Sequence, residues 1–190
     1  MKMLKVISAL MLCSMVVTTA NADQAIKARA MESKKVVKEF MGQLKGELKS
    51  AMKAGGPMNA VTVCNKTAPV IAKNLSEKYG WDVSRTSLKT RNSNNAPDAW
   101  EAKVLQEFES RKAKGEAVKP MKYFEVVESA QGKQFRFMKA IPTGKVCLQC
   151  HGENLSDELQ AKINEVYPED KATGYKLGDV RGAFSITQPM

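Results

Sequence analysis

Hydrophobic residues recur at steps of three and four over residues 23–53, as expected for one face of an amphipathic helix. This apolar face consists of Ile26, Ala30, Val37, Phe40, Met41, Leu44, Leu48 and Met52. Gly55, Gly56 and Pro57 follow directly, and such residues end helices. The pattern predicts a long N-terminal helix that stops at this point.

A second helical pattern covers residues 58–79, and Gly80 ends it. Its apolar face carries Val61, Cys64, Ala68, Ile71 and Leu75. Pro69 lies inside this stretch, where a proline lacks the N–H that the helix needs and its ring crowds the preceding turn. We therefore expect the helix to be kinked or divided at Pro69, with Thr67 capping the second half.

The polar stretch at residues 85–100 is rich in turn formers and predicts an ordered loop. Pro97 is expected to begin a third helix, because its missing N–H is tolerated in the first turn. Trp100, Val104, Leu105 and Phe108 would face the core of the protein, and Gly115 lies beyond the end of this helix.

Strand patterns dominate the second half of the chain. Residues 121–128 and 133–141 predict a hairpin, and residues 179–187 predict a closing strand. Between them, Ser156 can cap a short helix that ends near Pro168. Helices followed by a small antiparallel sheet indicate an α+β fold.

Residues 1–22 have the features of a cleaved secretory signal. Lys2 and Lys5 precede an apolar run at residues 6–17, and Ala-Asn-Ala at residues 20–22 resembles a cleavage site. The run is too short to span a bilayer comfortably, and no second one follows. We therefore expect a single mature domain, residues 23–190, that is soluble in the periplasm without a transmembrane anchor.

The chain is basic, with 30 Lys and Arg residues against 20 Asp and Glu residues, a formal net charge of +10. The predicted cleavage removes two lysines and no acidic residue, which leaves +8. A basic surface favours acidic protein partners or an anionic membrane surface. Export and the absence of a nucleic-acid-binding motif argue against nucleic acid as a partner.

Residues 145–152 read KVCLQCHG. Cys-x-x-Cys-His is the attachment sequence of a c-type haem, in which both cysteines form thioethers and the histidine binds iron. A thioredoxin-like redox pair would require a βαβ unit, which the pattern does not predict. Zinc could take Cys64, Cys147, Cys150 and His151, but adjacent Cys150 and His151 point in different directions. We favour one covalent haem with His151 as its proximal ligand.

The second axial ligand is open on sequence grounds, because His151 is the only histidine. Met58, Met121 and Met138 are candidates, and so are the Cys64 thiolate, a lysine, water or no ligand. Signal cleavage removes Cys13 and leaves Cys64 without a cysteine partner once Cys147 and Cys150 hold haem. A lone cysteine on an apolar helix face can equally be an inert core residue.

Four stretches together resemble a known family. They are AVTVCNKTAPVIA (60–72), RTSLKTRNSNNAPDAWE (85–101), CLQCHG (147–152) and YPEDKATGYKLGDVRGAFSI (167–186). In this order they are similar to the exported single-haem c-type proteins with a PAS-like domain, a family that also supplies haem sensor modules to bacterial chemoreceptors and kinases. The resemblance implies a PAS-like antiparallel sheet with packed helices.

The resemblance also implies His and Cys as the two axial iron ligands, which correspond to His151 and Cys64. A thiolate stabilises ferric iron, so the reduction potential should lie below that of a His/Met cytochrome. Loss of Cys64 on reduction would open the iron to CO or NO. Arg85 and Arg91, together with Lys89 and Arg181, are candidates for contacts to the haem propionates. The alternative is that Arg91 and the asparagines of the loop only brace it through hydrogen bonds to the backbone.

We expect this protein to transfer electrons to or from a redox partner, which is acidic or membrane-associated. The alternative is redox or gas sensing through a separate partner. Peroxidase-type catalysis is disfavoured, because no distal histidine exists and Cys64 would occupy the iron. The sequence therefore predicts a protein that is not an enzyme.

Overall fold

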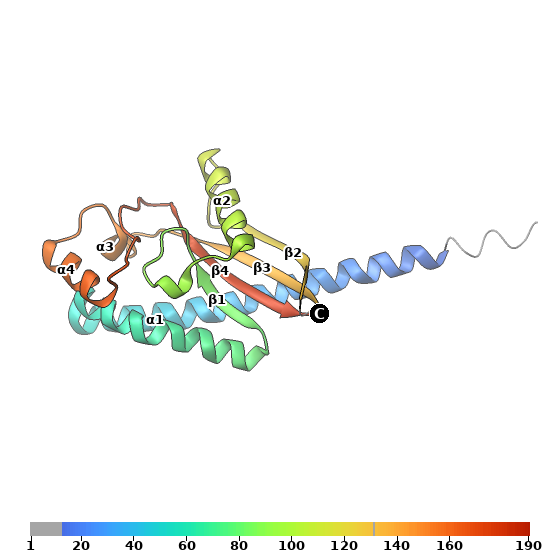
Figure 1. Ribbon diagram of the computed structural model, residues 1–190, viewed down its shortest axis with the longest axis horizontal. Helices are drawn as coiled ribbons and strands as arrows, with labels where there is room; N and C mark the ends of the chain where they lie inside the picture. Colours follow the sequence, from blue (N-terminus) through green and yellow to red (C-terminus); the bar gives the residue numbers. More distant parts are fainter. Residues whose placement is uncertain (1–12, 131) are drawn as a thin grey trace, which may run out of the picture.

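The computed structural model describes the backbone of residues 13–130 and 132–190, with side chains from residue 22 onward (Figure 1). Most of the predicted signal peptide, residues 1–12, lies outside the described residues. Within the described part of the chain, no helix combines the length and hydropathy needed to cross a membrane.

The helix α1, Cys13–Tyr79, is a helical hairpin (Figure 1). Its backbone is non-helical only at Gly55 and Gly56, and the φ of +63° at Gly56 lies in the left-handed region that favours glycine. The second arm returns beside the first, and the Lys78 Nζ lies 2.8 Å from the Glu39 Oε1. The predicted break at the glycine pair is confirmed.

The predicted division at Pro69 is wrong, because α1 continues through this residue with helical backbone angles. A proline inside a helix removes one hydrogen bond but does not prevent helical φ and ψ. Burial on both sides holds the arm together, since Ala68, Ile71 and Leu75 are all at most 5% exposed.

Four antiparallel strands form a sheet in the order β1-β4-β3-β2. They are β1 (Asp82–Thr86), β2 (Lys122–Ser129), β3 (Gly132–Pro142) and β4 (Val180–Pro189). The last strand therefore lies between the first and the third. The predicted α+β fold, with a long N-terminal helix and helices packed on an antiparallel sheet, is confirmed.

The strand β1 was not predicted, and its last two residues fall in the stretch interpreted as a loop. Arg85 pairs with Phe184 of β4, and Thr86 pairs with Ala183. The strand is short and mostly polar, so pairing with β4 rather than local propensity defines it. The helix α2, Ala99–Ala113, begins after Pro97, and Asp98 is its N-cap.

The two faces of the sheet are covered by different helices (Figure 1). One face packs on α1 through Val83, Phe135, Phe137, Phe184 and Ile186. The other packs on α2 through Met138, Ala140, Val180 and Ala183. The short helices α3 (Leu148–His151) and α4 (Asp157–Val166) contact the part of α1 near its hairpin turn. This end of the molecule contains the candidate site.

Candidate functional site

A cavity of about 480 Å³ lies between α1, the sheet and α3. Cys64, Cys147, Cys150 and His151 all line it, although Cys64 is far from the other three in the sequence. The volume is within the usual range for a small-molecule or cofactor site. The fold thus brings the predicted cysteines and the histidine to one cavity.

Small residues on the second arm of α1 make room for the cavity. Ala60, Cys64, Ala68 and Ala72 recur every four residues and all face it. The first arm contributes larger apolar side chains, namely Phe40, Met41, Leu44, Leu48 and Met52. The walls are therefore largely apolar, as a flat aromatic cofactor requires.

The two motif cysteines lie on a single helical turn. The carbonyl of Cys147 accepts hydrogen bonds from the backbone N–H groups of Cys150 and His151. Residues three and four apart on a helix lie on neighbouring positions of one face. Both thiols and the imidazole therefore reach the same cavity from α3.

His151 is oriented by a hydrogen bond to a backbone carbonyl. Its Nδ1 lies 2.6 Å from the Ala172 oxygen, which can only accept, so Nδ1 carries the proton. Burial, together with the nearby Arg181 and Arg91, holds the pKa of His151 well below its ordinary value. The imidazole is therefore neutral at pH 7, and its Nε2 lone pair is available to a metal.

Cys64 is a half-buried free thiol on the second arm of α1. Burial raises the pKa of Cys64, while the positive charges of Arg85 and Arg91 act in the opposite direction. Of the methionines considered from the sequence, Met121 and Met138 are fully buried beside α2. Met58 packs against the α4 core, and none of the three lines the cavity.

The described residues that line the cavity include several cations and no acid. The side chain of Arg85 has no carboxylate or carbonyl partner in the described chain, and its guanidinium lies 5.6 Å from the Phe40 ring centroid. Arg181 donates to the Ser87 hydroxyl at 3.2 Å, but its buried Nε has no acceptor among the described residues. Burial lowers the pKa of both guanidiniums. Such a site favours an anionic guest.

Unlike Arg85 and Arg181, Arg91 forms an ion pair with a carboxylate of the described chain. Its Nε and Nη2 lie 3.0 and 3.1 Å from the two carboxylate oxygens of Asp170, with side chains only 10% and 3% exposed. Nη2 also donates to the carbonyls of Cys150 and Ala172. Arg91 thus joins the loop after β1 to α3 and to the loop after α4.

Zinc and disulfide chemistry receive little support from the arrangement. Across residues 22–130 and 132–190, no group of three or more His, Cys, Asp or Glu side chains is placed to hold a metal ion. Cys147 and Cys150 are free thiols beside an antiparallel sheet, without the βαβ unit of a thioredoxin-like site.

Several lining residues were not singled out from the sequence. Met41 and Met52 appeared only as part of a hydrophobic face, and Tyr167 only as the first residue of the family stretch 167–186. Asp170 was not assigned a role, because its partner Arg91 is distant in the sequence. The four-residue spacing of small residues on α1 is the one local signal that could have indicated a cavity.

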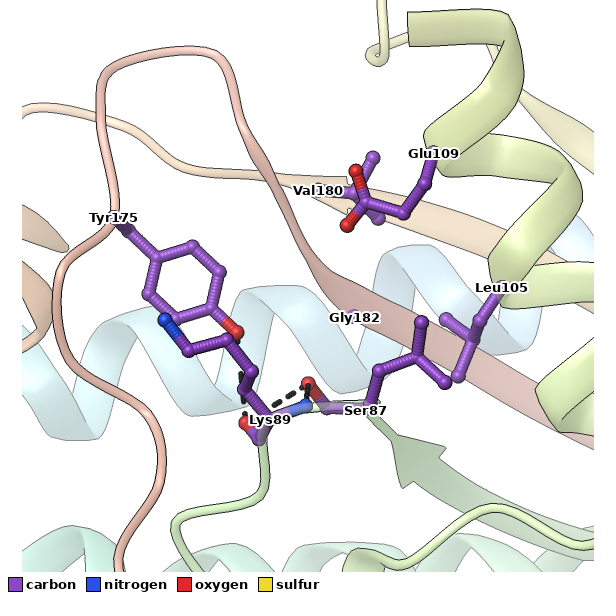
Figure 2. Close-up of a pocket in the computed structure, with 8 residues that line it drawn as sticks. Ser87, Lys89, Leu105, Glu109, Tyr175, Val180 and Gly182 are labelled. Carbon is purple, nitrogen blue, oxygen red and sulfur yellow. Dashed lines mark hydrogen bonds between the residues drawn. The ribbon is translucent and has the colours of Figure 1, made fainter. Parts of the chain in front are cut away.

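A second, much smaller cavity lies between α2, the loop after β1 and the segment before β4 (Figure 2). Its volume is about 30 Å³, enough for a water molecule but not for a cofactor. Figure 2 shows Tyr175 and Lys89 on one side and Glu109 of α2 on the other. The Tyr175 ring meets the His151 ring edge-on, with centroids 6.2 Å apart. Tyr175 therefore buttresses the imidazole from outside the main cavity.

Comparisons with known proteins agree with this geometry. The family model Tll0287-like matches residues 18–189. No curated protein matches the chain. Among solved structures, the crystal structure of the cyanobacterial heme-protein Tll0287 is similar, with a TM-score of 0.61 and 26% sequence identity over 84% of this chain and 96% of that chain. The family resemblance carried by the four sequence stretches is confirmed.

Proposed function

This chain belongs to the Tll0287-like family, and from that membership we propose that it is an exported c-type haem protein that transfers electrons at low potential. The observation that carries the proposal is the cavity that gathers Cys64, Cys147, Cys150 and His151. The similar crystallised protein is described as a heme-protein, which supports the same cofactor class.

The cavity suits haem on several grounds. Cys147 and Cys150 reach it from one helical turn, as two thioether bonds require. The walls are apolar, and Arg85 and Arg181 can each pair with a propionate. No acidic side chain among the described lining residues competes with those carboxylates.

Bound haem supplies a one-electron ferric/ferrous couple, and the protein sets its potential through the axial ligands. We assign His151 Nε2 as the proximal ligand, because Nδ1 is committed to the Ala172 carbonyl. We assign Cys64 as the distal ligand, because its thiol faces the cavity from α1. A thiolate stabilises the ferric state and lowers the potential.

Electron transfer in the periplasm is the role that we favour, with a partner that is acidic or membrane-associated. The net charge of +8 that remains after the predicted cleavage removes Lys2 and Lys5 from a chain of +10 supports an acidic partner surface. We expect no catalysis, because Cys64 would occupy the distal iron position. Sensing is the second candidate, since α1 carries Cys64 and could respond if that ligand dissociates on reduction.

Low-temperature EPR of the ferric holoprotein tests the axial ligands. We expect a low-spin rhombic signal with the narrow g-spread of thiolate ligation, which Cys64→Ala abolishes. Met41→Leu and Met52→Leu are matched controls, because both residues line the cavity and should leave the signal unchanged. A His/Met-type signal that survives Cys64→Ala would refute the His/Cys assignment.

The behaviour of the iron ligands on reduction distinguishes electron transfer from sensing. Reduction and reoxidation without a change of ligands would support electron transfer. Dissociation of Cys64 on reduction, followed by tight binding of CO or NO, would support sensing and displace the electron-transfer proposal.

A further inference from the structure

We propose that Arg91 is a positioning residue that tunes the electron donation of His151 through a carbonyl that both side chains share. The inference rests on the proposed haem function and concerns the effect on His151 of Arg91, a residue outside the proposed iron ligand set. It begins with the Ala172 oxygen, which accepts from His151 Nδ1 at 2.6 Å and from Arg91 Nη2 at 3.2 Å.

Two donors at one carbonyl compete for its electron density. A positively charged guanidinium draws that density more strongly than a neutral N–H group does. The Ala172 oxygen is thus a weaker acceptor for Nδ1 than an unshared carbonyl would be. Because a strong acceptor at Nδ1 raises the basicity of a ligating histidine, Arg91 limits the electron density that His151 donates to iron.

The guanidinium is held in this place by several fixed acceptors. Asp170 binds it through both carboxylate oxygens, and the Cys150 carbonyl accepts from Nη2 at 2.7 Å. Asp170 Oδ1 also accepts from the Ala172 N–H at 3.0 Å, which fixes the carbonyl-bearing residue itself. One planar side chain therefore bridges α3 and the loop that carries Ala172.

Lysine cannot reproduce this arrangement. Its ammonium is a point donor on a flexible stem, whereas the guanidinium directs rigid donors to three acceptors at once. The surrounding backbone does not depend on Arg91 alone. The N–H groups of Gly174 and Tyr175 bond the carbonyls of Gly152 and His151, and the Lys171 N–H bonds the Thr90 carbonyl. We therefore expect Arg91 variants to fold.

The test compares Arg91→Gln and Arg91→Lys in the haem-loaded protein, with Arg111→Gln as the control. Arg111 pairs with Glu116 on the surface, so its substitution removes the same charge away from the site. Haem content of the wild-type protein is measured first, and a wild-type chain without covalent haem would refute the proposed function rather than this inference. The readouts are the reduction potential and the ferric EPR g-values.

We expect both Arg91 variants to have a lower reduction potential than the wild type and shifted g-values, with Arg111→Gln unchanged. Arg91→Lys distinguishes the directed hydrogen bonds from a charge effect, because it keeps the positive charge and loses only the rigid, directed donors of the guanidinium. A reduction potential equal to that of the wild type in Arg91→Lys would overturn the inference, because the charge of residue 91 alone would then set the potential. Unchanged values in both variants, or loss of haem from both, would also overturn it, since Arg91 would then serve the fold alone.

Discussion

The face of the sheet that α1 covers has two ends with opposite character. Away from the hairpin turn, the space is filled by the chain itself, and Val36, Leu75, Phe135, Phe137 and Ile186 are each at most 1% exposed. Toward the turn, the same helix and sheet enclose a cavity of about 480 Å³. One helical hairpin thus forms both a close-packed core and a binding site.

The side chains of the second arm explain the difference. At the packed end it presents Leu75, which fills the space above the sheet. At the open end it presents Ala60, Cys64, Ala68 and Ala72. The two ends also differ in charge, because the packed end is apolar while Arg85 and Arg181 face the cavity. A well-packed core has neither a large empty volume nor an unpaired charge, so both features of the open end favour a bound anionic guest.

Removal of the proposed attachment cysteines should have the largest effect. Cys147→Ala together with Cys150→Ala should abolish covalent haem, because both thioether bonds are lost. Haem that stays with the chain after denaturation measures this directly. The packed end should stay folded, with the far-ultraviolet circular dichroism of the wild-type apoprotein. Covalent haem in the double variant would exclude these cysteines as the attachment site.

A large-to-small substitution in the packed end should have the second-largest effect. Phe137 is fully buried, so Phe137→Ala should lower the free energy of unfolding by about 3–5 kcal/mol. Chemical denaturation measures the change. Phe137 does not line the cavity, so the absorption spectrum of the folded haem-loaded protein should not move. A shifted spectrum would mean that the two ends are not independent.

Arg85 should affect the apo and haem-loaded proteins in opposite directions. Without a guest its guanidinium is an unpaired charge, so Arg85→Gln should stabilise the protein in the Cys147→Ala/Cys150→Ala background. In the haem-loaded protein the same change removes a charged hydrogen bond and should cost about 1.5–3 kcal/mol. Denaturation of both forms tests this, and a change of equal sign in both would contradict the pairing.

The smallest effect is expected at the cap of α2, Asp98, which does not line the cavity. Asp98 accepts from the Glu101 N–H at 2.8 Å, so Asp98→Ala should lower the free energy of unfolding by about 1 kcal/mol at neutral pH. Partial burial opposes ionisation of Asp98, but this hydrogen bond and the Arg136 guanidinium outweigh it and lower its pKa.

The lowered pKa gives this contribution a defined pH dependence. The stabilisation by Asp98 is fully present above the ordinary value of 3.8 and is lost as the pH falls through the lower folded-state pKa. The difference between wild type and Asp98→Ala should therefore shrink in acid. A difference that grows below pH 4 would contradict the assignment. The haem spectrum should be unchanged by Asp98→Ala at neutral pH.

Local patterns in the sequence determined much of this protein. Helical periodicity and the Gly55-Gly56 break predicted the two helical arms of α1 and the point where they separate, because both depend on neighbouring residues. The motif at residues 147–151 likewise needs only one helical turn to direct two thiols and an imidazole to one side. Such features depend only on residues close together in the sequence and not on the tertiary fold.

Tertiary structure decided the features that need distant partners. The strand β1 exists because β4, nearly the last segment of the chain, pairs with it. Pro69 stays helical because its arm is buried against the first arm and the sheet. Arg85 at the end of β1 and Arg91 in the loop that follows are only six residues apart. Arg91 pairs with Asp170, whereas Arg85 has no carboxylate partner in the described chain. Sequence spacing does not distinguish two such arginines, since only the folded chain sets which carboxylate lies within reach.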